Sequence, residues 1–324
     1  MQSGFAALAM GVAMGVATVA VAEPAIHQMS DLKIAATIPL SKGADWVAIT
    51  KDRVWIGSKT PFAVSEIDPV TNQVTATIEL PGNPCGGLAA DADSLWVPLC
   101  GSTPQLAQID LKKKILARVL KIGPGASEGG ITAGAGSVWL ITDKTGSLAR
   151  IDPVSGTIAQ TIQLPAGSYN PVFNSGRIWV SRADGAELTV VDAKTATVVD
   201  HVAIGPHPRF LTSGGGAVWT LNQEDGSVSR IDIANPQSVS AIPLRIPGFG
   251  GDIAFGDGRV WATLMKTPLS VVDAANSNIL CQWQGAGGDS LGVGHGAVWL
   301  TNLREGTVSR INLSDLPADC NVAK

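Results

Sequence analysis

Several residues of this chain have side chains suited to ligand binding or to acid–base chemistry. His207 could act as a general base, with the Glu128 carboxylate as its partner. Other carboxyl groups could hold a cation, Trp46 and Tyr169 could stack on a ligand, and Arg209 could hold an anion. The candidate ligand-binding residues are Asp45, Trp46, Glu128, Tyr169, Asn170, Arg182, His207, Arg209, Asp252, Asp289 and Arg304.

A repeated tryptophan predicts the elements that position these candidates. A Trp flanked by aliphatic residues recurs at intervals of about 40 residues. The seven copies are Trp55, Trp96, Trp139, Trp179, Trp219, Trp261 and Trp299. A pair made of Ile or Val followed by Asp or Asn comes after each of them, from Ile67-Asp68 to Ile311-Asn312. Repeats of this length, built from short alternating strands and turns, predict the blades of a propeller.

The two ends of the repeat array predict how the ring closes. The last unit stops after its third strand, which ends at Asn312, whereas residues 34–40 resemble the fourth strand of the first complete unit, residues 74–80. A blade shared by the two chain ends leaves no open sheet edge. We therefore predict an all-β, seven-bladed β-propeller at residues 31–324, with four-stranded antiparallel blades and an N-terminal strand that closes the last blade. Residues 23–30 are interpreted as a linker.

The candidate residues fall where the repeats differ from one another. Most precede the first strand of a blade, and the loops between second and third strands, with Lys59, Arg182, Glu224 and Arg304, open on the same face. This predicts a concave site of mixed polarity at one end of the central channel, suited to a small molecule or a peptide. The alternative is that these polar side chains only hydrate a water-filled channel.

The N-terminal segment predicts export. Residues 5–22 form an apolar stretch that ends in Ala20-Val21-Ala22 before Glu23-Pro24, which is typical of a secretory signal peptide at residues 1–22. An uncleaved membrane anchor is the alternative. We expect a periplasmic or secreted protein, with no stable membrane span after cleavage.

Four cysteines in an exported chain favour disulfides. A hairpin centred on Ala92-Asp93 places Cys85 directly opposite Cys100, which predicts one bridge. Cys281 and Cys320 could form a second if the C-terminal tail folds back. Four buried thiols are the alternative, and neither pair has the spacing of zinc ligands.

Composition narrows the class of partner. The chain is 45% hydrophobic and 15% charged, with 37 glycines and a net charge of −4. These values suit stacked sheets joined by many turns, and the absence of a basic excess gives no reason to expect nucleic acid as a partner.

The repeats resemble those of a known class of propeller. The segments Gly215–Trp219 with Gly226–Asp232, and Gly296–Trp299 with Gly306–Ile311, resemble the seven-bladed YVTN-repeat propellers of bacteria and, more loosely, the streptogramin B (virginiamycin B) lyase family. Such motifs specify blades, so the resemblance implies the fold and leaves the activity open.

The lyase resemblance also implies a magnesium ion and a His base, with a carboxylate three residues after the Trp of a blade. This chain departs from that pattern, because the positions hold Ser58, Leu99, Thr142, Arg182, Asn222, Leu264 and Asn302. Glu128, Asn170, Asp252 and Asp289 form another possible set for Mg²⁺ or Ca²⁺, of the kind that lactonases on propellers use.

The leading hypothesis is an exported propeller, expected to be a monomer, that binds a small ligand, a peptide or a partner protein at its channel face. The alternative is a metal-assisted lyase or hydrolase that uses His207. A third possibility is a passive scaffold in an envelope complex, recognised through the side of a blade.

Overall fold

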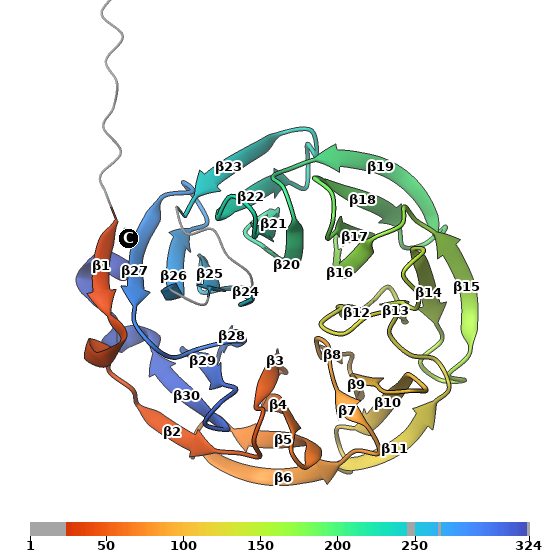
Figure 1. The fold of residues 1–324 in the computed structure, drawn as a ribbon, viewed down its shortest axis with the longest axis horizontal. Helices are drawn as coiled ribbons and strands as arrows, with labels where there is room; N and C mark the ends of the chain where they lie inside the picture. Colours follow the sequence, from red (N-terminus) through yellow and green to blue (C-terminus); the bar gives the residue numbers. More distant parts are fainter. Residues whose placement is uncertain (1–23, 245–249, 265–266, 323–324) are drawn as a thin grey trace, which may run out of the picture.

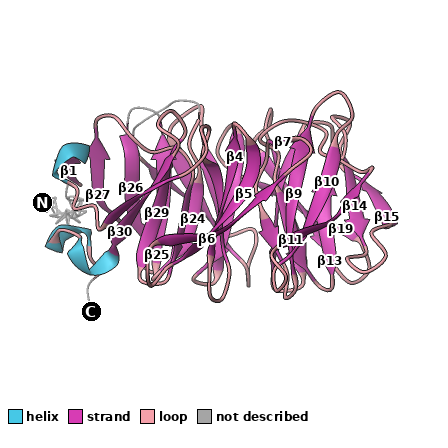
Figure 2. Cartoon of the chain, turned by 90° about the horizontal axis from the view of Figure 1, so that it is seen from below, coloured by secondary structure: helices cyan, strands magenta, loops and turns pink. Residues whose placement is uncertain are grey.

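The computed structural model describes residues 24–244, 250–264 and 267–322. These residues form seven sheets arranged in a ring around a central channel (Figure 1). Within each blade the strands run antiparallel from the channel to the outer rim, and their loops lie on the two faces of the disc (Figure 2). The seven-bladed β-propeller predicted from the repeats is confirmed.

The strands of the first four blades follow one another in sequence order. Blade one contains β3 (Asp45–Ile49), β4 (Val54–Lys59), β5 (Phe62–Asp68) and β6 (Gln73–Glu79). Blade two contains β7 (Asn83–Pro84), β8 (Ala89–Ala90), β9 (Ser94–Cys100), β10 (Gln105–Asp110) and β11 (Ile115–Leu120). Blade three contains β12 (Ile131–Gly134), β13 (Ser137–Ile141), β14 (Ser147–Ile151) and β15 (Ile158–Gln163). Blade four contains β16 (Ser168–Asn174), β17 (Arg177–Arg182), β18 (Glu187–Asp192) and β19 (Thr197–Ala203).

The last three blades complete the ring. Blade five contains β20 (Pro208–Gly214), β21 (Ala217–Asn222), β22 (Ser227–Asp232) and β23 (Val239–Pro243). Blade six contains β24 (Ile253–Gly256), β25 (Arg259–Leu264), β26 (Thr267–Asp273) and β27 (Ile279–Gln284). Blade seven contains β28 (Leu291–Gly294), β29 (Ala297–Asn302) and β30 (Thr307–Asn312), followed by the short helices η2 (Leu313–Asp315) and η3 (Ala318–Cys320).

Strand β2 (Ala36–Pro39) closes the ring as predicted. It pairs antiparallel with β30, with Ile38 opposite Val308, and supplies the fourth strand of blade seven. The two ends of the chain therefore share one blade, and the hydrogen bonds of that sheet join the first repeat to the last.

Residues 25–28 are not the linker that the sequence suggested. They form strand β1 (Ala25–Gln28), which pairs in parallel with β27 and adds a fifth strand to the rim of blade six, before η1 (Met29–Asp31) leads into β2. The His27 ring lies 5.5 Å from that of Trp283, and its Nε2 lies 3.1 Å from a carboxylate oxygen of Asp319. Contacts with both blade six and the C-terminal tail hold this short strand.

Both predicted disulfides are formed, Cys85–Cys100 and Cys281–Cys320. The register around the first differs from the prediction. Ala89 lies opposite Trp96 as expected, but Asn83, not Cys85, lies opposite Cys100. Residues 85–88 interrupt the inner strand between β7 and β8, so the bridge joins diagonal rather than facing positions.

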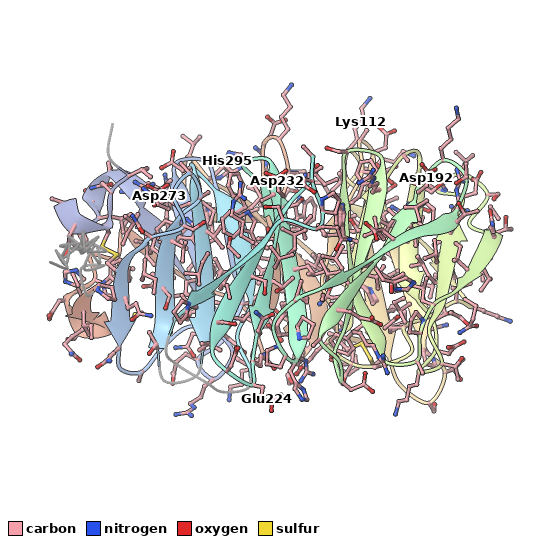
Figure 3. The ribbon with its side chains drawn as sticks, turned by 90° about the horizontal axis from the view of Figure 1, so that it is seen from above. Lys112, Asp192, Glu224, Asp232, Asp273 and His295 are labelled. Atoms are coloured by element: carbon pink, nitrogen blue, oxygen red, sulfur yellow. A yellow bond between two sulfur atoms is a disulfide. The ribbon has the colours of Figure 1, made fainter. Side chains whose placement is uncertain are left out.

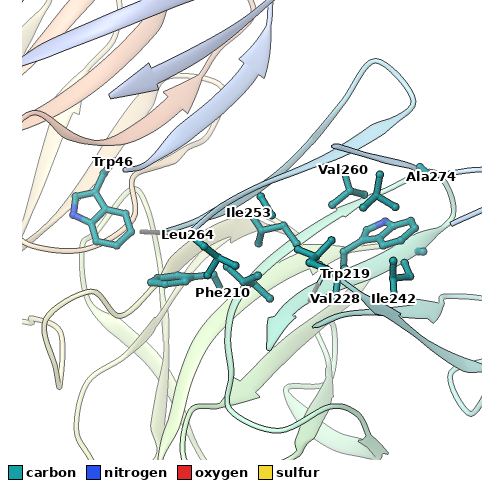
Figure 4. Packing of buried hydrophobic residues seen from close by; sticks show 14 residues of the cluster. Trp46, Phe210, Trp219, Val228, Ile242, Ile253, Val260, Leu264 and Ala274 are labelled. Carbon is teal, nitrogen blue, oxygen red and sulfur yellow. The ribbon is translucent and has the colours of Figure 1, made fainter. Parts of the chain in front are cut away.

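The repeated tryptophans are core residues that join neighbouring blades. All seven are at most 1% exposed. Figure 4 shows Trp219 of blade five packed against Val260 and Ala274 of blade six. In blades three, five and seven an Arg from the third strand lies over the Trp ring, with Arg310 5.5 Å from the ring centroid of Trp299. Large rings shared between sheets account for the strict repetition of this residue.

The repeated Asp residues cap turns on the face opposite the candidate site. Oδ1 of Asp68 accepts hydrogen bonds from the backbone N–H groups of Val70 and Thr71, at 2.8 and 3.0 Å, and Asp192 and Asp232 do the same in their blades. Figure 3 shows Asp192 and Asp232 at one face of the disc and Glu224 at the other. We call the face with Glu224 the channel face.

Among the described residues, no helix has the length and apolar character needed to cross a bilayer. The predicted signal peptide, residues 1–22, lies outside the described residues.

Candidate functional site

The first strands of all seven blades line a cavity of about 280 Å³ in the central channel. Its wall is mostly aliphatic and aromatic, and Asp252 is the one ionisable residue among the described residues that line it. The polar side chains Thr132 and Thr212 already accept hydrogen bonds from the backbone N–H groups of Phe173 and Phe255. The cavity therefore offers a ligand mostly apolar side chains and one carboxyl group.

Aromatic residues form part of this wall. Trp46 and Phe210 lie with their ring centroids 6.1 Å apart (Figure 4). Leu88 packs against the same cluster of buried residues. Trp46 was a candidate from the sequence, whereas Leu88 and Phe210 were not. Trp46 is 6% exposed, and its Nε1 has no hydrogen-bond partner among the described residues. The indole thus packs as a wall residue and carries an unsatisfied donor.

Four carboxylates and two cations lie near one another at the channel. We call this set the channel mouth: Asp45, Glu128, Asp252, Asp289, Lys59 and Arg209. Lys59 Nζ lies 3.1 Å from Asp45 Oδ2. Arg209 Nη2 lies 2.8 Å from Glu128 Oε2 and donates a 2.9 Å hydrogen bond to the Tyr169 hydroxyl. Each of the two cations is therefore in an ion pair with one carboxylate of the mouth.

The Arg209 contacts join three blades. Its guanidinium lies 5.0 Å from the ring centroid of Tyr169, whose hydroxyl donates a 2.6 Å hydrogen bond to the carbonyl of Ser127. The result is a bridge from blade three through blade four to blade five. Tyr169 was expected to stack on a ligand. Its ring face instead contacts the Arg209 guanidinium, and its hydroxyl makes two hydrogen bonds.

Asp252 and Asp289 have no cationic partner among the described residues. Asp252 accepts hydrogen bonds from Ser290 Oγ, at 2.6 Å, and from the backbone N–H of Ile253, at 2.8 Å. Burial nevertheless raises the pKa of Asp252 to about 7, with a smaller contribution from the charge of Asp45. Burial and the same neighbouring charge raise the pKa of Asp289 to about 6. The channel mouth thus has four carboxyl groups and two cations, and two of the carboxyl groups are in ion pairs among the described residues.

Three residues at the mouth adopt left-handed backbone conformations. Trp46, Glu128 and His207 have φ values of 57°, 60° and 49°. Such conformations cost a residue with a Cβ about 1–2 kcal/mol and persist where surrounding structure holds them, often at functional sites. These three positions lie on blades one, three and five, where the chain enters the inner strand.

The two proposed catalytic residues do not pair with each other. His207 Nε2 lies 3.3 Å from Glu224 Oε2 on its own blade, whereas Glu128 pairs with Arg209. The sequence predicted that both residues lie on the channel face, but it did not predict which side chains each of them contacts.

The remaining candidates lie around the mouth. Arg182 makes ion pairs with Asp184 and Glu187, at 3.3 and 3.5 Å. The Asn170 amide lies over Gly130, where an added Cβ would come within 1.5 Å of Asn170 Oδ1. Arg304 and Asp289 line a second hollow of about 800 Å³ at blades six and seven.

The carboxylates of the mouth do not form a compact metal-binding group. Among the described residues, one set of three potential His, Cys, Asp or Glu ligands has its atoms within 4.8 Å of one another, namely His27, Asp319 and Cys320 at the rim. Cys320 there is bonded to Cys281, so its sulfur is not a thiolate ligand. At the positions where the lyase pattern has a carboxylate, Asn222 is buried and donates to Ser227 and Ser229.

Several solved structures have folds similar to that of this chain. Virginiamycin B lyase from Staphylococcus aureus superposes with a TM-score of 0.72 at 16% identity, over 87% of this chain and 99% of that one. A streptogramin B lyase structure gives 0.68 at 18%, over 85% and 94%. The fold is shared with these lyases. BamB from Moraxella catarrhalis gives 0.61 at 12%, over 86% and 97%. No protein-family model and no curated protein sequence matches the chain.

Proposed function

We propose that this chain is an exported β-propeller that binds a small ligand, a peptide or a partner protein at its channel face, without chemistry of its own. The observation that carries the proposal is the unbalanced charge of the mouth. Lys59 and Arg209 are each paired with a carboxylate, whereas Asp252 and Asp289 form no ion pair among the described residues, although the charge of Lys59 acts on Asp289. A ligand with a positive group would supply the missing charge.

The shape of the channel supports a ligand site over a channel that is merely hydrated. Water is held in proteins by several polar partners. The wall contributed by Trp46, Leu88 and Phe210 offers few such partners, so an organic group fits it better than ordered water does.

Export is supported by the cysteines. All four are paired, and disulfides persist in oxidising compartments such as the periplasm or the extracellular space. The apolar segment before Glu23 would act as the signal peptide. One chain closes its own ring through β2, so a monomer would be sufficient for function.

The catalytic alternative is less well supported. A lyase or hydrolase would need His207 beside a carboxylate that faces a substrate, or a set of carboxylates close enough to share a metal ion. Here His207 contacts the exposed Glu224, and Glu128 is paired with Arg209.

A thermal-shift screen tests the proposal. The purified protein is melted with organic cations, neutral compounds, anions, and basic and acidic peptides, with Mg²⁺, Ca²⁺ or EDTA. We expect cationic compounds or basic peptides to raise Tm, and Asp289→Asn to reduce that rise. Asp52→Asn makes the same charge change in an exposed turn of the opposite face and should leave it unchanged. Stabilisation by a divalent metal alone, or equal loss in both variants, would count against the proposal.

A further inference from the structure

We propose that the channel cavity binds a small organic amine, with its protonated nitrogen at the Asp252 carboxylate and its apolar body against the wall that Trp46 and Phe210 form. This inference rests on the proposed function and names the chemical class of the ligand. It concerns the cavity that Asp252 lines, and not the ion pairs of Lys59 and Arg209.

The size of the cavity sets the size of the ligand. An apolar protein cavity of ~150 Å³ is enough to bind benzene. The channel cavity has about 280 Å³, so it has room for a single ring with a short aminoalkyl chain. A long peptide or a polycyclic compound would extend into the mouth.

The polar side chains of the cavity wall determine which ligand charge is favoured. Thr132 and Thr212 accept hydrogen bonds from neighbouring backbone N–H groups, and the other polar side chains among the described residues that line the cavity are the Asp252 carboxyl and the Asn170 amide. Of these two, Asp252 alone can bear charge. A neutral ligand would leave that carboxyl without a counter-charge, and an anion would be repelled.

The neighbours of Asp252 leave it available to a ligand cation. Ser290 and the backbone N–H of Ile253 each donate one hydrogen bond to it, and the mouth cations Lys59 and Arg209 are 3.1 and 2.8 Å from other carboxylates. Carboxylate oxygens can accept further hydrogen bonds, so an ammonium group can be added without displacing Ser290.

The aromatic wall suits the same ligand. The face of a Trp ring attracts cations, by about 0.5–1 kcal/mol at exposed sites and more in desolvated ones. The Phe210 ring already has the Arg209 guanidinium 5.8 Å from its centroid, so it contributes apolar contact. Trp46 is 6% exposed, and its buried Nε1 donor has no acceptor among the described residues, which costs free energy.

Binding should depend on pH in one direction. Asp252, with its pKa raised to about 7, is mostly protonated at pH 5 and ionised at pH 8, whereas an alkyl amine stays protonated across this range. Amine affinity is therefore expected to rise between pH 5 and pH 8, and the affinity of a neutral analogue to stay constant.

Calorimetric titration with three probes of one shape tests the inference: phenethylamine, 2-phenylethanol and phenylacetate. At pH 8 we expect phenethylamine to bind at least tenfold more tightly than the other two. Asp252→Asn, which keeps the shape of the side chain, should weaken the amine at least tenfold, and Asp52→Asn should not. Leu88→Phe, which narrows the cavity and keeps the carboxylate, should weaken it too.

Two results would overturn the inference: equal affinity for amine and alcohol, or unchanged amine affinity in Asp252→Asn. Suppose that phenethylamine does not bind, while other cations or basic peptides raise Tm and Asp289→Asn reduces that rise. The amine assignment is then wrong, and the proposed function stands. If no compound of either set binds, both are wrong.

Discussion

Ser290 of blade seven donates a hydrogen bond to Asp252 of blade six, with 2.6 Å between Oγ and Oδ2. This contact holds a buried carboxyl group at the wall of the channel. The hydrogen bond stabilises the ionised carboxylate, but burial has the larger effect, since the pKa of Asp252 is raised to about 7. The folded protein therefore binds a proton at Asp252 more tightly than the unfolded chain does.

Because of Asp252, the free energy of unfolding should decrease as pH rises. Between about pH 4 and pH 7 the folded state holds more protons at this site than the unfolded state, so the free energy of unfolding decreases with pH. Asp252→Asn removes the buried charge and should stabilise the protein by about 1–3 kcal/mol at pH 8, with little effect at pH 4. Urea unfolding at both pH values checks this, and a variant destabilised at pH 8 would contradict it.

Arg310 should stabilise the seam where the ring closes. Its Nη1 donates a 2.8 Å hydrogen bond to Asn72 Oδ1 of blade one, and its guanidinium lies over Trp299. Arg310→Ala should cost about 2–3 kcal/mol, because a hydrogen bond from a charged group and a cation–π contact are both lost.

Arg230 is the matched control for this prediction. It lies over Trp219 in the same way, but its one ion pair among the described residues is with Asp232 of its own blade, at 3.9 Å. Arg230→Ala should cost about 0.5–1 kcal/mol. Equal losses in the two variants, measured by urea unfolding, would show that the contact between blades seven and one contributes nothing.

The division between core and site can be tested with Trp139 and Glu128. Trp139 is fully buried, so Trp139→Ala should cost about 3–5 kcal/mol. The Glu128 side chain is 49% exposed, and Glu128→Ala should change stability by less than about 1 kcal/mol. Thermal and urea unfolding of both variants provide the comparison. Similar losses would mean that the channel mouth is part of the core.

The second disulfide should hold the C-terminal tail to blade six. Cys320 lies in η3 and is bonded to Cys281 of β27, beside the His27–Asp319 contact of β1. The Cys281→Ala, Cys320→Ala double variant should lose about 2–4 kcal/mol. It should also be cleaved faster by proteases after residue 313, as followed by mass spectrometry. Unchanged stability and cleavage would show that the tail is held without the bridge.

The fold could be predicted from the sequence because each blade repeats the same two structural requirements. A Trp must fill the space between sheets, and an Asp must cap the turn before the outer strand, so both residues recur at a fixed interval. The closing strand was predictable for the same reason, since residues 34–40 repeat the pattern of residues 74–80.

Features that occur once were not predictable. Strand β1 has four residues and pairs in parallel at a sheet edge, so it shows no repeat and little alternation. The register shift at residues 85–88 follows from an interruption in the inner strand that has no counterpart in other blades.

At the site, the sequence placed the side chains on one face but could not pair them. Arg209 reaches Glu128 across blade four, and His207 reaches Glu224 instead of Glu128, because the distance between blades is set by the stacking of whole sheets. Phe210 was missed because an apolar residue of an inner strand resembles any other core residue until the channel is assembled.

The crystal structure of the protein with the compound that stabilises it most in the thermal-shift screen tests the central claim most directly. We predict electron density in the central channel, with a positively charged group of the ligand within hydrogen-bonding distance of Asp252 or Asp289. Density on the opposite face, or at the side of a blade, would contradict the assignment of the channel face as the binding site.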